Sequence, residues 1–226
     1  MKKCIVLLAG WMVAAIALAA EDRAFSLAPA GDVDAARIER IRVRMEETAG
    51  VAVRLAPAVP LEPGQTLEAI GRAAAQTLDK GDPGIIVLAR PTDVQPQGVC
   101  LPWERFAVLN LAKLEAGADE TKLERRAEQE GLRVMAMLLG MSACPFPLCV
   151  LVGYEKLEDL DGMSRSYCPP CQDRFNRLAR EAGIRLTEGA ADAAPAEIPA
   201  GAGEAAPAVE VAPAAAPAAE PAPAAE

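Results

Sequence analysis

Apolar and polar residues recur along the middle of the chain with the two periods that distinguish helices from strands. In the segment 33–48, apolar residues recur at steps of three and four (Ile38, Ile41, Met45), which places them on one face of a helix. The run 84–89 is almost entirely apolar and has the length of a buried central strand. Because helical and extended segments alternate, the pattern predicts an α/β (α+β) fold.

Further elements complete the predicted domain. The longest is a helix over 119–141, whose C-terminal part is apolar nearly all round, so we expect it to be buried in the centre of the domain. An irregular, cysteine-rich segment follows over 144–167. The remaining predicted elements are strands over 51–55 and 106–111, a helix over 66–78, and a last helix from Pro169 or Pro170 to Ala182.

The N-terminal residues 1–20 have the composition of a secretory signal peptide. Lys2 and Lys3 precede an uncharged apolar run that closes on small residues at 17–19, as a cleavage site does. A retained run would approach the roughly 18 apolar residues that can span a bilayer, so a membrane anchor is the alternative. We therefore expect export to the periplasm or the extracellular space, with membrane contact only through a retained signal.

Residues 188–226 consist mostly of Ala, Pro, Gly and Glu. This composition cannot bury enough apolar surface to offset the entropy of ordering, so it predicts a disordered tail and leaves one domain over 21–187. Seven acidic residues and no lysine or arginine lie in the tail, which carries most of the net charge of -9. The domain itself is nearly balanced in charge, so we expect no nucleic-acid partner.

The chain contains no histidine. Histidine is the commonest metal ligand and the usual general base near neutral pH. Its absence excludes a histidine-containing zinc site, a Ser-His-Asp triad and a Cys-His pair. Any catalytic centre would have to be built from other residue types.

Four cysteines form two close pairs that a longer loop separates: Cys144 and Cys149, then Cys168 and Cys171. This spacing suits a tetrahedral zinc site, because each pair supplies two thiolates from a tight turn. Two structural disulfides are an alternative, since disulfides persist outside the cytoplasm. A redox dithiol is a third interpretation, because Cys168 precedes a helix whose dipole would lower its thiol pKa. Spacing alone leaves all three open.

Residues 25–180 resemble the archaemetzincin family of zinc peptidases. The family pattern runs HExxHxxGxxHCxxxxCxM and continues to a CxxC. The stretch from Arg133 to Leu151 follows its spacing, with Gly140 at the family's glycine. The resemblance implies a metzincin-like mixed sheet, a long central helix and a C-terminal Cys4 zinc knuckle. It also implies one structural Zn²⁺, held at the positions of Cys144, Cys149, Cys168 and Cys171.

The departures from the family pattern fall where the catalytic zinc would bind. The first ligand, the general base, the second ligand and the third ligand correspond to Arg133, Val134, Met137 and Ala143. An arginine has no lone pair to donate to a cation, and an alanine has no ligand atom. Leu151 replaces the family's methionine below the metal. These substitutions predict a pseudoenzyme that acts as a binding or scaffold module, with a peptide or an envelope protein as partner.

An alternative hypothesis is a hydrolase or a thiol-disulfide oxidoreductase with a centre foreign to the family. Glu128 or Glu130 would then act as acid or base, or the Cys168-Pro-Pro-Cys171 pair would cycle between thiol and disulfide. Arg133 could also pair with Glu130 or Glu158 and fill the groove.

The other residues of chemical interest have structural interpretations. Met137, Trp103 and Phe106 are interpreted as core residues. Cys100 is interpreted as a buried free thiol, with an intermolecular disulfide as the alternative.

Overall fold

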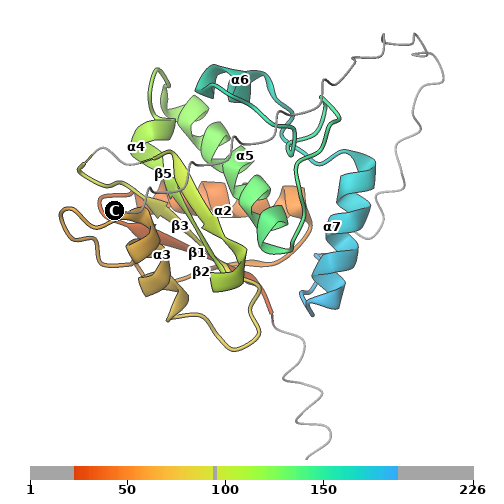
Figure 1. Ribbon diagram of the computed structural model, residues 1–226, viewed down its shortest axis with the longest axis horizontal. Helices are drawn as coiled ribbons and strands as arrows, with labels where there is room; N and C mark the ends of the chain where they lie inside the picture. The colour runs from red at the N-terminus through yellow and green to blue at the C-terminus, as the bar shows by residue number, and fades with distance from the viewer. Residues whose placement is uncertain (1–22, 94–95, 188–226) are drawn as a thin grey trace, which may run out of the picture. The chain divides into compact units, whose positions relative to one another are not determined.

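The computed structural model describes residues 23–93 and 96–187. Its centre is a five-stranded sheet in the order β2-β1-β3-β5-β4 (Figure 1). Four strands run parallel: β1 (Phe25–Ala30), β2 (Val53–Leu55), β3 (Ile85–Ala89) and β5 (Phe106–Asn110). At one edge, β4 (Gly98–Leu101) pairs antiparallel with β5. The predicted mixed sheet is therefore confirmed.

Helices cover both faces of this sheet (Figure 1). α2 (Ala35–Ala49) and α5 (Glu120–Leu138) pack on one face, where they share a core with Ile86 of β3. α3 (Leu67–Ala75) packs on the opposite face against Ile85. Because successive residues of a strand point to opposite faces, β3 is buried on both sides, which explains its continuous apolar sequence.

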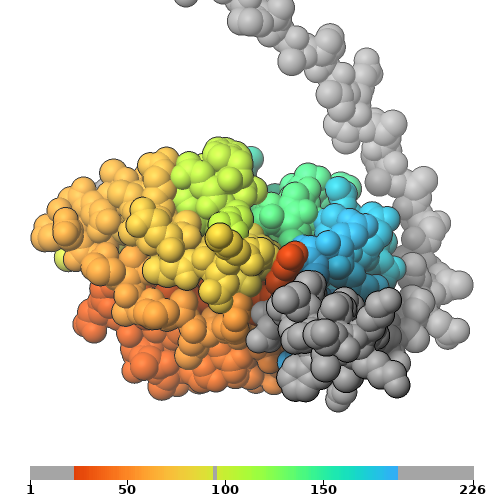
Figure 2. Space-filling model, turned by 90° about the horizontal axis from the view of Figure 1, so that it is seen from below, coloured from red at the N-terminus to blue at the C-terminus, as the bar shows by residue number. Residues whose placement is uncertain are grey.

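Shorter elements connect these layers. α4 (Leu111–Leu114) follows β5, a 3-10 turn (Pro102–Glu104) joins β4 to β5, and α6 (Leu157–Gly162) lies within the cysteine-rich segment. The last helix is α7 (Pro169–Glu181), and its buried Phe175 belongs to the same core as α2 and α5. In Figure 2 the blue surface of α7 lies beside the green surface of the end of α5 and the following loop.

Local sequence determines where the long helix α5 begins and ends. Asp119 caps its N-terminus by accepting a hydrogen bond from the Lys122 N–H at 2.8 Å. Gly140 follows its end with a φ of 79°, a left-handed conformation that favours glycine. A second glycine allows close packing on α2, because a Cβ atom at Gly131 would lie 2.6 Å from Sδ of Met45.

Most predicted elements are present, with ends that differ by a few residues. The predicted long central helix is α5, and the predicted central strand is β3. The elements that the pattern did not predict are β1, β4, α4 and α6. The sequence of β4 shows no clear alternation of apolar and polar residues, and none of its residues is fully buried. Its strand structure comes from pairing with β5.

Two residues interpreted as core are in fact exposed. Met137 has 40% of its surface exposed and Trp103 has 77%, whereas Phe106 is buried as expected. Met137 lies on the side of α5 that lines a cleft next to β4, and Trp103 lies in the turn between β4 and β5. No element covers either side chain within the described part of the chain, so the end of α5 is not buried all round.

The predicted signal peptide (1–20) and the predicted tail (188–226) lie outside the described residues. The domain limits at 21 and 187 therefore stay predictions. Between residues 23 and 187, leaving out 94 and 95, no helix combines the length and the apolar character that crossing a bilayer requires.

Candidate metal centre and neighbouring cleft

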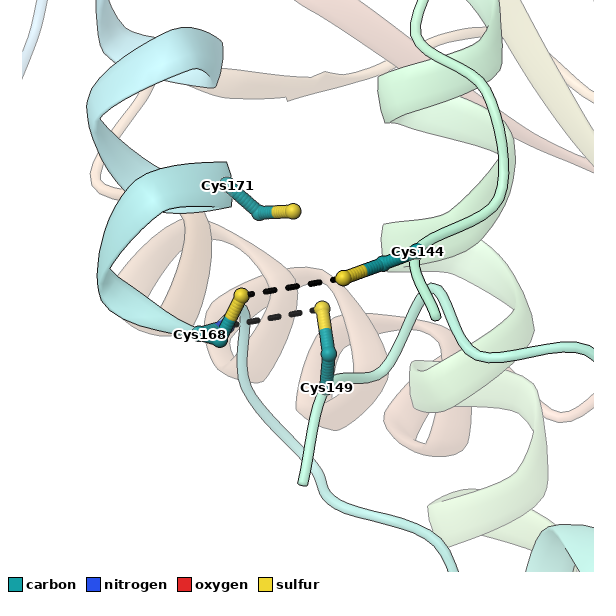
Figure 3. Close-up of side chains that lie close together, drawn as sticks. All are labelled: Cys144, Cys149, Cys168 and Cys171. Carbon is teal, nitrogen blue, oxygen red and sulfur yellow. Dashed lines mark hydrogen bonds between the residues drawn. The ribbon is translucent and has the colours of Figure 1, made fainter. Parts of the chain in front are cut away.

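The Sγ atoms of the four predicted ligand cysteines all lie within 4.8 Å of one another and point toward a common centre (Figure 3). Cys144 and Cys149 come from the loop after α5, whereas Cys168 and Cys171 come from the start of α7. The two pairs interleave, since the Cys144 Sγ is 3.8 Å from the Cys168 Sγ. All four are free cysteines.

Local backbone contacts hold these sulfur atoms in place. The Phe146 N–H donates a hydrogen bond to the Cys144 Sγ, and the Cys168 N–H donates one to the Cys149 Sγ, each at 3.4 Å. Cys168 is the N-cap of α7, and Pro169 occupies the first helical position, where no N–H is needed. The positive end of the helix dipole thus lies beside the second cysteine pair and favours thiolates there, whereas burial and the neighbouring cysteines raise the pKa of the Cys171 thiol.

The arrangement fits one tetrahedrally coordinated metal ion. Bonds of about 2.3 Å from a zinc ion to four thiolates would separate the sulfur atoms by about 3.8 Å, and Cys144 and Cys168 are 3.8 Å apart. Burial raises the pKa of the Cys149 thiol. At Cys144, hydrogen bonds from the Phe146 N–H and the neighbouring thiols outweigh the opposing effect of burial and lower the pKa. The four-cysteine group could therefore hold one metal ion.

A buried arginine secures the segment between the two cysteine pairs. Arg126 of α5 is 2% exposed and donates hydrogen bonds to both carboxylate oxygens of Asp161 in α6, at 2.7 and 2.8 Å. It also donates to the carbonyl oxygens of Leu114 and Ala116 at 2.7 and 2.8 Å. Gln129, in the next turn, donates to three carbonyl oxygens of the same segment. The guanidinium lowers the pKa of Asp161 to about 2. This ion pair fixes the segment between the two cysteine pairs against α5.

A cleft of about 380 Å³ lies between the edge strand β4 and the side of α5. Its apolar lining includes Val99, Leu109, Val134 and Met137, and its polar lining is Gln97, Glu130, Arg133 and Tyr154. Three of the four positions that the sequence resemblance aligns with the catalytic zinc site, Arg133, Val134 and Met137, therefore line one cavity. The fourth, Ala143, is exposed and is not among the lining residues.

Arg133 connects α5 to the segment that follows Cys149. Its Nη1 donates hydrogen bonds to the carbonyl oxygens of Val150 and Val152 at 2.8 and 2.6 Å. Its Nε lies 3.1 Å from Oε1 of Glu130, and its guanidinium stacks over the Tyr154 ring at 5.0 Å from the centroid. Of the two partners expected from the sequence, Arg133 thus pairs with Glu130.

A chain of polar groups extends from this ion pair across the cleft. The Gln97 side-chain amide donates a hydrogen bond to the Tyr154 hydroxyl, and the Tyr154 hydroxyl interacts electrostatically with the Glu130 carboxylate. Burial raises the pKa of the Glu130 carboxyl against the opposing effects of Arg133 and Tyr154. Burial, together with Glu130, also raises the pKa of Tyr154.

Other candidate residues take different places. Glu128 is buried and pairs with Arg165 in a groove between α2 and α5, so Glu130 alone of the two glutamates lines the cleft. Cys100 of β4 is a free thiol that also lines the cleft, and burial raises its pKa to about 11. Sequence reasoning singled out neither Gln97 nor Tyr154, because only the fold brings them together.

No protein-family model and no curated protein sequence matches the chain. Solved structures do match. The archaemetzincin of Methanopyrus kandleri superposes with a TM-score of 0.57 at 17% identity, over 70% of this chain and 96% of that one. A zinc-dependent peptidase from Methanocorpusculum labreanum gives 0.56 at 17% identity, over 67% and 100%.

A third structure, the archaemetzincin of Archaeoglobus fulgidus in complex with malonate, gives a TM-score of 0.52 at 17% identity, over 66% of this chain and 99% of that one. Each of these proteins is covered almost completely, so the likeness extends over their whole fold rather than over a shared motif. The chain therefore has the archaemetzincin fold, with a four-cysteine group between the loop after α5 and the start of α7 that could hold one metal ion.

Proposed function

We propose that the chain is a catalytically inactive archaemetzincin-like protein that binds one structural zinc ion and acts as a binding or scaffold module outside the cytoplasm. The observation that carries this proposal is the environment of Arg133. The sequence resemblance aligns Arg133 with the family's first zinc ligand, and the guanidinium is held by Val150, Val152 and Glu130. A permanently protonated group at that place repels a metal cation.

The four cysteines support zinc as the bound metal. Four thiolates in a tetrahedron are typical of structural zinc, and one of the proteins with the same fold is a zinc-dependent peptidase. A bound ion would connect the loop after α5 to α7, and its binding free energy would contribute to folding. Four sulfur ligands leave no position for water, so an ion held there would be structural rather than catalytic.

The remaining residues support a loss of peptidase activity. Zinc peptidases need three protein ligands and a coordination position open to water. The chain has no histidine, and Val134 stands at the position of the general base. In the part of the chain that the structure describes, the four cysteines are the one group of three or more Cys, Asp or Glu residues arranged to hold a metal.

The cleft beside β4 supports a binding role. Within the described residues β4 pairs with β5 alone, so its other edge is open to an extended peptide or to a segment of an envelope protein. Export is proposed from Lys2, Lys3 and the apolar run that follows them. N-terminal sequencing should find a mature chain that starts near Ala20 or Glu21, and an intact Met1 on cytoplasmic protein would contradict export.

Metal analysis and a peptidase assay test the proposal together. The purified protein should contain one zinc ion per chain and should not cleave a broad peptide library that an active zinc peptidase digests in parallel. The four cysteines of the metal group (Cys144, Cys149, Cys168 and Cys171) should react with a maleimide only after a chelator is added. Thiols that react only after reduction would indicate disulfides or a redox pair. Two zinc ions per chain, together with cleavage that a chelator abolishes, would contradict the inactive assignment.

A further inference from the structure

We propose that Arg133 makes the cleft a metal-independent binding site for an uncharged carboxamide group, of the kind found in peptide main chains and in Asn and Gln side chains. This inference rests on the proposed function, because it assumes that the cleft binds a ligand and does no chemistry. It goes further by naming the recognition group and the ligand class.

The guanidinium of Arg133 is held in place before any ligand arrives. Two carbonyl oxygens accept from its Nη1, Glu130 lies 3.1 Å from its Nε, and the Tyr154 ring lies beneath it. A long side chain normally loses rotamer freedom when it binds a ligand, and that loss weakens binding. Here the contacts within the protein have already restricted the side chain, so a ligand would meet a pre-organised donor.

Hydrogen-bonding capacity remains on both sides of the polar chain. A guanidinium has five N–H donors, and within the described residues the two on Nη2 of Arg133 have no acceptor. The side-chain nitrogen of Gln97 donates to Tyr154, which leaves the side-chain oxygen of Gln97 as an acceptor. Oε1 of Glu130 is buried beneath the cleft surface and is not accessible to a ligand, so the acceptor that the cleft offers is the side-chain oxygen of Gln97. The cleft therefore offers donors and acceptors together.

The charge balance of the cleft determines which ligands suit these groups. Glu130 and Arg133 form an ion pair, so the cleft offers no net charge to an ammonium or a carboxylate ion. Moving an ion from water into a mostly apolar cavity without a counter-charge is strongly unfavourable. A carboxamide has no net charge, and it combines a carbonyl acceptor for Arg133 with an N–H donor for the side-chain oxygen of Gln97.

The size and the lining of the cavity agree with this ligand class. A volume of about 380 Å³ lies within the range of small-ligand pockets, roughly 300 to 1,000 Å³. Val99, Leu109, Val134 and Met137 supply apolar contacts around the polar groups. Small apolar side chains flanking an amide would therefore be accommodated. The Cys100 thiol, which also lies on the wall, is uncharged near neutral pH because burial raises its pKa to about 11.

The test compares peptides that differ only in charge, with the zinc-loaded full-length mature chain observed by NMR. The probes are N-acetyl-trialanine amide, which is uncharged, zwitterionic trialanine, and acetate. The uncharged peptide should bind saturably and at least tenfold more tightly than trialanine, and it should shift the Arg133 Nε resonance. Equal or tighter binding of trialanine or acetate would overturn the proposal, as would the absence of binding by the uncharged peptide.

Variants assign the binding to Arg133. Arg133→Met should weaken binding of the uncharged peptide at least tenfold. Arg44→Met removes an exposed arginine that pairs with Glu47 on α2 and should leave binding unchanged. Gln97→Met leaves the contacts of Arg133 intact and should also weaken binding of the uncharged peptide. It therefore tests the carboxamide site even if Arg133→Met fails to fold. Unchanged affinity in the folded cleft variants would refute the site.

These results are separable from the test of the proposed function. A chain that contains one zinc ion and cleaves no peptide, yet does not bind the uncharged probe, would overturn the carboxamide site alone. Cleavage that a chelator abolishes would overturn the proposed function, whatever the binding result.

Discussion

The Arg126→Met variant should lower the free energy of unfolding by about 3 kcal/mol. Methionine retains much of the aliphatic stem but removes all four hydrogen bonds that the guanidinium donates. The carbonyl oxygens of Leu114 and Ala116 lose these bonds, at a cost of about 1 kcal/mol each. The charge-assisted bonds to Asp161 contribute the remainder.

The estimate lies at the lower end of what loss of a buried ion pair costs, roughly 3 to 5 kcal/mol. Asp161 keeps 20% of its side chain exposed, and Lys122 and Arg125 remain within 3.5 Å of its carboxylate. It would therefore not become an isolated buried charge. Because α6 lies between the two cysteine pairs, the variant should also release bound zinc faster to a chelator.

Urea denaturation of the zinc-loaded protein at neutral pH measures this effect. In a thermal melt of a domain of this size, a loss of about 3 kcal/mol in the free energy of unfolding corresponds to a fall in melting temperature of roughly 6 to 12 °C. Arg125→Met is the matched control, because Arg125 is one-third exposed, hydrogen-bonds the Asp161 carbonyl oxygen, and lies 3.5 Å from the carboxylate without donating a hydrogen bond to it. The control should lose less than about 1 kcal/mol. Equal losses in the two variants would show that the buried network does not stabilise the fold as argued.

Three further predictions concern the metal centre, the helix packing and the pH response. Cys168→Ser should lower the zinc content and the melting temperature together, and a variant with unchanged values would argue against a structural role of the cluster. Gly131→Ala should destabilise the domain by about 1 to 3 kcal/mol in urea, because the added methyl would collide with the buried Met45 side chain. The pKa of Asp161 is lowered to about 2, so its stabilising contribution is complete above its unfolded pKa of about 4 and is lost as the pH falls through 2. Acid titration followed by circular dichroism should show this loss in the natural chain and a smaller one in Arg126→Met.

The sequence alone determined the features that depend on neighbouring residues. The helical periods of α2 and α5 and the apolar run of β3 are local patterns, and the structure confirms these elements. The absence of histidine likewise needed no coordinates, because it is a property of composition. The spacing of the cysteines predicted a metal knuckle but left disulfides open, since spacing does not specify which sulfur atoms meet.

Tertiary structure decided what depends on residues far apart in the chain. Pairing with β5 makes β4 a strand although its own pattern is weak, and the resulting edge leaves Met137 exposed in a cleft. Arg126 would be expected on the surface from its charge, yet it is buried because Asp161 and two carbonyl oxygens converge on it. The contacts of Arg133 with Val150 and Val152 likewise follow from the loop folding back along α5. Local sequence sets backbone propensity, whereas the partner of a polar group is set by which segments pack together.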